Sequence, residues 1–410
     1  MTKKTSNLVM AVANDNGNGW AKTYCQFEDG TSNTTITPSL YAPVSKHETI
    51  PDLEESNEVQ DFNDNMDVLI KSPSLKTTSE YLVGKAAINS GNNLIDYNVE
   101  ANLGKVTPDI SMIMPLAKIA YAALNHVLSV AKYIPTTINV NLTYYLTCLP
   151  ISEFVNKERR ETLRKKLSKG KHTVVIKNFE HDIKVVISSN PTNTFIYPEG
   201  ITAQIGLIYD PESYLTFRQG EIYANSPYKD GLEYSNTGNA LLIDIGDGTT
   251  DISIMNGVHP LKGLGVNTSL NQGVGTAAAA ASDQLAIDYP RLGHYTRSVF
   301  LNRVNKNTNE GKTLHDKYLI PQIDALLTTI ETEVEKEFSK TNNDINTVVI
   351  LGGGVKFLNK QNRLAFQKML NELNPFNDQQ TIWWIDPGHS QLLNLDGLKI
   401  FLARKFGQNR

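Results

Sequence analysis

The chain has 410 residues, which is enough for two domains that each contain a full core. Apolar residues make up 40% and charged residues 20% of the sequence, the proportions of an ordinary soluble globular protein. The net charge of −4 argues against a protein that coats nucleic acid, so we expect no direct DNA binding. The two cysteines, Cys25 and Cys148, lie in apolar runs, which favours buried thiols in a reducing cytoplasm.

A glycine-rich turn follows the first apolar run. Leu8–Ala13 predicts a buried strand and Trp20–Phe27 predicts a second one. The sequence Asp-Asn-Gly-Asn-Gly at 15–19 predicts a tight turn whose N–H groups approach an anion, because glycine has no Cβ. Lys22, just after the turn, is placed to reach a phosphate oxygen. The apolar run is too short for a signal-peptide core or a membrane span, so no membrane contact is expected.

Local patterns predict the next elements of the first half. A polar, acid-rich stretch at 45–67 is expected to be a mobile insertion in a small subdomain. Apolar residues at helical spacing predict a long helix over Ile110–Ala131. Thr137–Leu149 is then expected to be a strand that enters the domain centre.

Residues 156–169 predict a short helix with Leu163 and Leu167 facing inward and a basic outer face. A basic face of this kind is usually exposed to solvent and binds nothing. The alternative interpretation is that it contacts an acidic partner or DNA. The strand pair that follows is flanked by His172 and His181, which we expect at the surface.

Glu199 stands directly before a helix predicted over 201–209. Hydrolysis of a triphosphate needs a side chain that accepts a hydrogen bond from the attacking water, and Glu199 is the candidate for this role. The alternative is a first-turn glutamate that the helix dipole stabilises. Spacing alone leaves both interpretations open. Residues 220–239 are expected to form a polar loop that links to the second domain.

A second glycine-rich turn repeats the first. Ala240–Ile243 predicts a buried strand, and 244–251 (Asp-Ile-Gly-Asp-Gly-Thr-Thr-Asp) has the same spacing of aspartate and glycines as 15–19. A carboxylate at a strand end needs a cation, usually Mg²⁺, before it can hold a phosphate. One such hairpin is more often a plain turn. The pair predicts a duplicated domain whose two turns share a nucleoside triphosphate and its metal.

The last apolar strand is expected at Thr347–Leu351, after a long helix over Lys317–Lys340. It leads into the triple glycine Gly352–Gly354, which offers a flat backbone face to a purine or an α-phosphate. A triple glycine also suits a plain strand–helix turn.

These motifs resemble those of the actin superfamily, in the same order along the chain. Asp15–Lys22 matches the first phosphate motif, Asp244–Asp251 the second, and Gly352–Gly354 the adenosine motif. Trp384–Leu398 is similar to the closing segment before the last helix. The resemblance implies an α/β fold with duplicated actin-like (RNase H-like) domains around a nucleotide cleft, each with a smaller inserted subdomain.

The resemblance also implies domain limits. Domain I is expected at 1–205, with an insertion at about 36–105. Domain II is expected at 206–395, with a smaller subdomain at about 270–345. A C-terminal helix at 396–410 is expected to pack on domain I.

Within the superfamily, the chain resembles the bacterial plasmid-segregation actins of the ParM type. The residues that carry this resemblance are Leu149-Pro150 before the basic helix, Gly170-Lys171-His172, and Pro198–Gly200. It implies a cytoplasmic bacterial ATPase (GTP possible) that polymerises with nucleotide and Mg²⁺ and disassembles after hydrolysis. The expected partners are further copies of the chain and a DNA-binding adaptor of the ParR type at the plasmid centromere.

The resemblance assigns roles to single residues. Glu199 takes the water-ordering role, and Asp15 and Asp244 are associated with the metal through water; these three form the expected catalytic set. Further nucleotide contacts are expected from Gly17, Asn18, Gly19, Lys22, Gly246, Asp247, Gly248, Thr249, Gly352, Gly353, Gly354 and Lys356.

Two alternatives share the duplicated fold, because a fold does not fix a function. A sugar- or acetate-type kinase would need a catalytic base beside a small-molecule site, and the sequence offers no clear candidate. A cell-shape or division actin would need an amphipathic membrane anchor. The apolar and basic segment near residue 400 could serve as one, but a final helix packed on the first domain explains it equally well.

Overall fold

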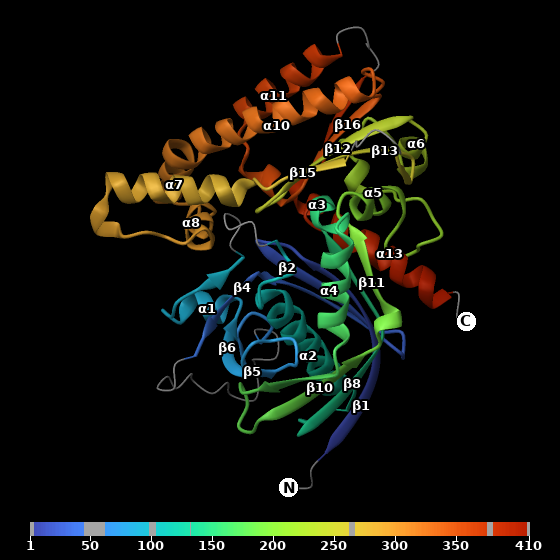
Figure 1. Ribbon diagram of the computed structural model, residues 1–410, viewed down its shortest axis with the longest axis vertical. Helices are drawn as coiled ribbons and strands as arrows, with labels where there is room; N and C mark the ends of the chain where they lie inside the picture. The colour runs from blue at the N-terminus through green and yellow to red at the C-terminus, as the bar shows by residue number, and fades with distance from the viewer. Residues whose placement is uncertain are drawn as a thin grey trace. The chain divides into compact units, whose positions relative to one another are not determined.

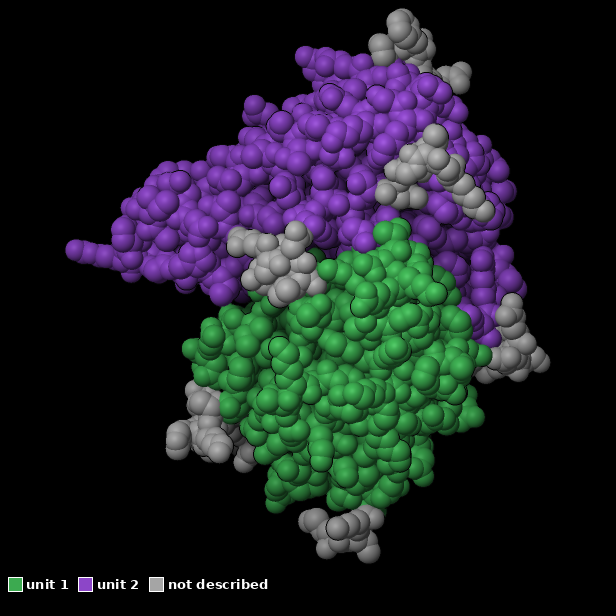
Figure 2. All heavy atoms as spheres, in the orientation of Figure 1, with its two compact units in different colours: residues 1–98, 103–149, 153–197 green, residues 99–102, 150–152, 198–410 purple. Residues whose placement is uncertain are grey.

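The computed structural model describes residues 4–44, 62–97, 104–131, 133–261, 267–374 and 380–407 (Figure 1). Contact density divides the chain into two compact units (Figure 2). Unit 1 comprises residues 1–98, 103–149 and 153–197, and unit 2 comprises residues 99–102, 150–152 and 198–410.

Unit 1 contains one mixed sheet of eleven strands in the order β3-β2-β1-β8-β10-β9-β5-β6-β4-β7, with β11 paired to β8. The strands are β1 (Thr5–Asn16), β2 (Trp20–Phe27), β3 (Ser32–Pro38), β4 (Leu40–Pro43), β5 (Met66–Lys71), β6 (Ser79–Val83), β7 (Ile95–Asp96), β8 (Thr137–Leu149), β9 (Lys171–Ile176), β10 (Ile183–Ser189) and β11 (Thr194–Pro198). The helices are α1 (Lys85–Asn89), α2 (Ile110–Ala131), α3 (Ile151–Phe154), which crosses the unit boundary, and α4 (Lys157–Ser168).

The helix α2 forms the centre of the unit 1 core. It packs against β1, β2 and β9, and most of its side chains are buried. By length and composition it could cross a membrane, but 72% of its apolar window is buried inside the unit. The ammonium group of Lys118 lies inside this core, where it donates hydrogen bonds to Asn63. These contacts explain α2 as a core helix.

Unit 2 contains a six-stranded sheet in the order β14-β13-β12-β16-β17, with β15 paired to β13. The strands are β12 (Asn239–Ile245), β13 (Thr250–Asn256), β14 (His259–Pro260), β15 (Asn267–Leu270), β16 (Thr347–Leu351) and β17 (Thr381–Trp384). The helices are α5 (Ile201–Ile208), α6 (Gly231–Ser235), α7 (Val274–Asp288), α8 (Arg297–Val304), α9 (Asn309–Thr313), α10 (Ile320–Lys340), α11 (Lys360–Leu373), α12 (Pro387–Ser390) and α13 (Leu393–Gly407).

The two units repeat one strand arrangement. In unit 1, β1 pairs antiparallel with β2 on one side and parallel with β8 on the other. In unit 2, β12 pairs antiparallel with β13 and parallel with β16. β1 and β12 are buried where they approach their turns, as expected for central strands covered on both faces. The predicted class, a duplicated α/β fold, is confirmed.

Several predicted elements form as expected. The long helix and the strand after it have the predicted bounds, as α2 and β8. α4 buries Leu163 and Leu167, and the pair β9–β10 follows it. A C-terminal helix is present as α13, which begins at Leu393 rather than 396 and packs against α5 within unit 2, where Arg218 and Asp396 form an ion pair of 2.8 Å. Its expected packing on domain I stays a prediction. The domain limits given above stay a prediction.

Other predictions were wrong in detail. Thr347–Leu351 is not the last strand, because β17 adds to its parallel edge. The long helix α10 begins at Ile320 and is preceded by a π-helix over Leu314–Leu319. The loop at 220–239 contains α6 and a 3₁₀ helix, because its tyrosines pack around Trp383 in the core. Of the expected insertion, 45–61 lies outside the described residues.

The end of that insertion and one histidine were also misjudged. Phe62 and Met66 are buried in the core of unit 1, so this part of the stretch belongs to the packed core and not to a mobile insertion. His172 is buried rather than exposed, because it occupies an inward-facing position of β9. Its Nδ1 lies 2.7 Å from Ser72 Oγ and its Nε2 lies 3.1 Å from the Leu167 carbonyl oxygen.

Candidate functional site

The first hairpin is held in a fixed shape by close backbone packing. β1 ends at Asn16 and β2 begins at Trp20, so the turn consists of Gly17, Asn18 and Gly19. A Cβ at Gly17 would lie 2.8 Å from the Trp20 carbonyl oxygen, so only glycine fits without a shift. The turn therefore keeps its backbone tightly folded.

Ser39 fixes the same turn from the side. Its hydroxyl donates a hydrogen bond of 2.6 Å to the Gly17 carbonyl oxygen, and its N–H donates one of 2.9 Å to the Gly19 carbonyl oxygen. With the carbonyl groups of Gly17 and Gly19 bound in this way, the orientation of the turn is set. No local pattern around Ser39 predicts this role.

Asp15 and Lys22 face each other directly across the hairpin. They are register partners, and Lys22 Nζ lies 2.6 Å from Asp15 Oδ2. Both side chains are almost fully buried. The Cys148 thiol donates a weak hydrogen bond of 3.7 Å to Asp15 Oδ1. Asp15 thus has a cationic partner beside the turn, and the positive charge of Lys22 is held at a fixed point.

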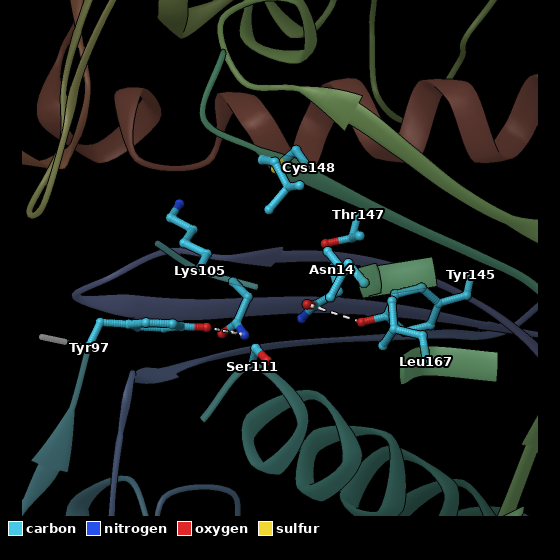
Figure 3. A pocket seen from close by; sticks show the side chains of 11 residues that line it. Asn14, Tyr97, Lys105, Ser111, Tyr145, Thr147, Cys148 and Leu167 are labelled. Carbon is cyan, nitrogen blue, oxygen red and sulfur yellow. Dashed lines mark hydrogen bonds between the residues drawn. The ribbon is translucent and has the colours of Figure 1, made fainter. Parts of the chain in front are cut away.

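A small cavity lies behind this hairpin (Figure 3). Its volume is about 10 Å³, room for a single water molecule. Asn16 donates a hydrogen bond of 2.8 Å to the Tyr97 hydroxyl, and the Tyr145 hydroxyl donates one of 3.2 Å to Asn14 Oδ1. The cavity is too small for a nucleotide. The other side chains that line it are Lys105, Ser111, Thr147, Cys148, Leu149, Leu163 and Leu167.

The second hairpin has the same construction. β12 ends at Ile245 and β13 begins at Thr250. The Gly246 N–H donates a hydrogen bond of 2.9 Å to the Thr249 carbonyl oxygen, and a Cβ at Gly246 would lie 2.8 Å from that oxygen. Asp244 has Asp251 as its register partner, where the first hairpin has a lysine. The two hairpins therefore match in backbone and differ in charge.

The start of α7 supports the second turn. The N–H groups of Val274 and Gly275 donate hydrogen bonds of 3.0 Å and 2.6 Å to the carbonyl oxygens of Gly246 and Asp247. The Asp247 carboxylate forms an ion pair of 3.3 Å with the buried guanidinium of Arg297. Asp247 thus anchors the turn to α7 through its carbonyl oxygen and to α8 through its carboxylate.

The triple glycine packs against the end of β12. Gly352 has φ +101°, and a Cβ there would lie 2.4 Å from Asp244 Oδ1. A Cβ at Gly354 would lie 2.7 Å from the Ile245 carbonyl oxygen, whereas one at Gly353 would meet no atom closer than 3.8 Å. Two of the glycines are thus required by packing and the middle one has free space beside it. Burial lowers the pKa of Lys356, and the negative charge of Asp247 opposes that shift.

Asp244 is oriented by a chain of hydrogen bonds from two helices. The Asn394 amide donates to Asp244 Oδ2 over 3.2 Å, and the Thr202 hydroxyl donates to Asn394 Oδ1 over 2.6 Å. Thr202 lies in the first turn of α5, three residues after the buried Glu199. Gly200, between β11 and α5, has φ +80°. The sequence did not predict this role for Thr202, and it predicted Asn394 only as part of the closing segment Trp384–Leu398.

The predicted residues thus form two groups. Asp15, Lys22 and the first turn belong to unit 1, and the remaining predicted residues belong to unit 2. Each group suits part of a metal-bound triphosphate, because it combines a buried carboxylate at a strand end with a glycine turn. The functional roles assigned to these residues stay predictions.

The fold is that of the actins. Between 97% and 98% of its length can be superposed on solved structures of actin-like proteins from bacteria and archaea. No family model matches the sequence, and no curated protein matches it. The likeness is therefore one of structure.

Three solved structures illustrate that likeness. The actin-like protein Alp7A has a TM-score of 0.65 at 17% identity, with 98% of both chains covered. ParM from a 15-stranded filament of Clostridium botulinum has a TM-score of 0.60 at 18% identity, with 97% of this chain and 99% of that chain covered. ParM of Bacillus thuringiensis with ATP has a TM-score of 0.56 at 15% identity, with 98% of this chain and 100% of that chain covered.

Proposed function

We propose that this chain is a nucleotide-dependent, filament-forming ATPase that segregates plasmid DNA in the bacterial cytoplasm. It polymerises with ATP and Mg²⁺, disassembles after hydrolysis, and reaches its plasmid through a centromere-bound adaptor of the ParR type. The repeated hairpin is the observation that carries this proposal. Both units present a buried aspartate at a strand end beside a tight glycine turn. GTP remains an alternative nucleotide.

The proposal assigns the charge of the phosphates to groups on both hairpins. Lys22 provides a cation fixed by Asp15, and backbone N–H groups of the glycine turns provide donors. Asp244 and Asp15 would hold Mg²⁺ through water, and a bound Mg²⁺ would neutralise part of the phosphate charge. The Asn394 amide keeps the Asp244 carboxylate in place.

The triple glycine is proposed to contact the nucleoside. Only Gly353 has free space at its Cα, so a base or sugar can approach the backbone there. Gly352 and Gly354 keep that backbone against Asp244 and Ile245, which joins the nucleoside contact to the metal-associated strand end.

Glu199 is proposed to order the attacking water. Its buried position before α5 restricts the carboxylate, and a fixed acceptor aligns a water better than a mobile one. This role is distinct from holding the nucleotide, so loss of Glu199 should separate hydrolysis from binding.

Known structures support assembly as the output. The similar ParM of Clostridium botulinum was solved as a filament, and that of Bacillus thuringiensis was solved with ATP. We extend both properties to this chain. Its own copies are its first partner, and the adaptor is its second.

Sedimentation and electron microscopy of the purified chain, with and without ATP–Mg²⁺, test the proposal. We expect filaments with ATP–Mg²⁺ and phosphate release that rises steeply above a critical protein concentration. Turnover proportional to protein concentration and dependent on an added sugar or acetate would instead identify a kinase. Filaments that support cell shape but leave plasmid inheritance unchanged would identify another type of actin.

A further inference from the structure

The basic helix α4 has a role that the nucleotide site does not explain. Residues 157–171 contain eight basic and two acidic residues, a net charge of +6, in a chain whose net charge is −4. Figure 1 shows α4 in unit 1 with β11 next to it, and Arg164 of α4 donates a hydrogen bond to Thr194 at the start of β11. Such a concentration of positive charge is a candidate for contact with a polyanion.

Half of these basic groups are already used within unit 1. Arg159 pairs with Glu153, and Arg164 pairs with Glu161. Arg160 donates to the Phe154 carbonyl oxygen, and Lys166 donates to the carbonyl oxygens of Val106 and Thr107. The Arg164 side chain also donates a hydrogen bond of 3.1 Å to the Thr194 carbonyl oxygen. These four hold α4 to its neighbours and are not free for a partner.

Other lysines near the end of α4 are exposed, and the segment after β5 contributes two more exposed lysines. Lys165, Lys169 and Lys171 are exposed near the end of α4 and the start of β9, and Lys71 and Lys76 are exposed after β5. These five residues are called the basic patch. None of them has an ion pair with a residue in the described parts of the chain.

Buried contacts bring the two segments together. Ser74 Oγ donates a hydrogen bond of 2.7 Å to the Lys166 carbonyl oxygen, and Ser72 Oγ lies 2.7 Å from His172 Nδ1. In the pairing of β5 with β9, Lys71 lies opposite Thr173, and Thr173 follows Lys171 by two residues. Because His172 also contacts the last turn of α4 through Leu167, the lysines of both segments are carried on one rigid surface.

The charges act on one another across this junction. Burial lowers the pKa of Lys166, the positive charge of Lys76 adds to that effect, and Asp109 opposes it. Lys76 follows Ser74 by two residues, and the Ser74 hydroxyl contacts the Lys166 carbonyl oxygen, so the segment after β5 and the end of α4 lie close together. A cluster of like charges held together in this way is destabilising without a partner.

The composition of the surface distinguishes between partners. The exposed large apolar side chains of the described residues lie outside 71–77 and 157–171. Protein interfaces are centred on apolar and aromatic side chains and are poor in lysine, whereas phosphate backbones are bound mainly by lysine and arginine. The surface therefore fits a nucleic acid better than an acidic protein.

We propose that the basic patch of unit 1 binds the phosphate backbone of double-stranded DNA directly, without sequence preference. This binding differs from our expectation from net charge, because the charge of a whole chain conceals a local cluster. It is independent of the nucleotide site. A weak contact of this kind would keep the protein near its DNA cargo.

Fluorescence anisotropy of a labelled 24-base-pair duplex with the full chain, without nucleotide, tests this inference. We expect binding at 50 mM salt that weakens steeply by 200 mM. The triple variant K165Q/K169Q/K171Q should bind at least fivefold more weakly, and the slope of log K against log salt should fall by about 2–3, one phosphate contact for each lysine.

The matched control is K306Q/K312Q/K360Q, which removes three exposed lysines of unit 2 and changes the net charge equally. It should bind DNA like the parent chain. Equal losses in both variants, or no binding of the parent at 50 mM salt, would overturn the proposal. Polyglutamate that displaces the duplex as well as unlabelled DNA of equal charge would assign the surface to an acidic protein instead.

Discussion

Lys22 Nζ and Asp15 Oδ2 lie 2.6 Å apart across the first hairpin, and the second hairpin has Asp251 at the position that corresponds to Lys22. The two turns are thus equivalent in backbone and opposite in charge at one position. The Asp251 carboxylate accepts a hydrogen bond of 3.2 Å from the Ile151 N–H, a structural task that Lys22 does not have. One hairpin therefore carries a cation at this position and the other a carboxylate.

Replacing Lys22 by methionine should weaken both stability and nucleotide binding. The substitution leaves the Asp15 carboxylate buried beside an apolar chain, and breaking a buried pair costs about 3–5 kcal/mol. Chemical denaturation of the parent and of Lys22→Met measures this loss. The double variant D15N/K22M removes both charges and should regain most of the stability. ATP affinity should stay low in both variants. Recovery of ATP affinity in the double variant would show that Lys22 does not bind the nucleotide.

Two neighbouring glycines should respond differently to alanine. Gly352→Ala places a methyl group 2.4 Å from Asp244 Oδ1 at φ +101°, which should cost about 1–3 kcal/mol of stability. Gly353→Ala has free space and should unfold at nearly the parental temperature. If the nucleoside contacts this backbone, Gly353→Ala should still bind ATP more weakly. Thermal unfolding and ATP titration compare the pair, and parental ATP affinity in Gly353→Ala would contradict the nucleoside contact.

The sequence predicted the parts of the fold that local patterns encode. The long helix α2 and the strands β1 and β12 follow from the spacing of apolar residues. The turns at Gly17 and Gly246 follow from the need for a residue without Cβ beside a carbonyl oxygen. These signals are local, and no tertiary contact was needed to find them.

The missed features depend on contacts between distant segments. Ser39 and Thr202 are ordinary residues in sequence, and their roles come from packing against the first turn and against Asn394. The sequence around His172 predicted a surface histidine, because its buried contact with Ser72 comes from a segment 100 residues earlier. β17 has four residues and is defined by its pairing with β16, which no periodicity could show.

The stability of unit 1 should depend on pH through Asp67. Burial first, and then the nearby charge of Glu80, raise the pKa of Asp67 to about 7, against the opposing charge of Lys177. Between pH 4 and 7 the folded chain therefore holds a proton that the unfolded chain has released. The free energy of unfolding should fall as pH rises through this range.

The variant Asp67→Asn cannot lose this proton, so its stability should change less between pH 4 and 7. Urea denaturation at pH 5 and pH 8 provides the comparison. The free energy of unfolding of the variant should exceed that of the parent at pH 8, and this difference should be smaller at pH 5. A constant difference at both pH values would show that Asp67 keeps an ordinary pKa in the folded chain.

Glu199→Gln should separate hydrolysis from assembly. The amide retains the size of the side chain but accepts a hydrogen bond from water more weakly, and loss of a positioned base costs about 10²–10⁴-fold in rate. We expect ATP binding and filament formation at parental protein concentrations, with phosphate release reduced by about that factor. Filaments of the variant should persist after ATP is added, because they leave the triphosphate state slowly. Glu158→Gln, at an exposed position of α4, is the matched control and should hydrolyse ATP like the parent. Phosphate release and light scattering in one sample follow both events, and parental hydrolysis by polymerised Glu199→Gln would assign the water-ordering role to another residue.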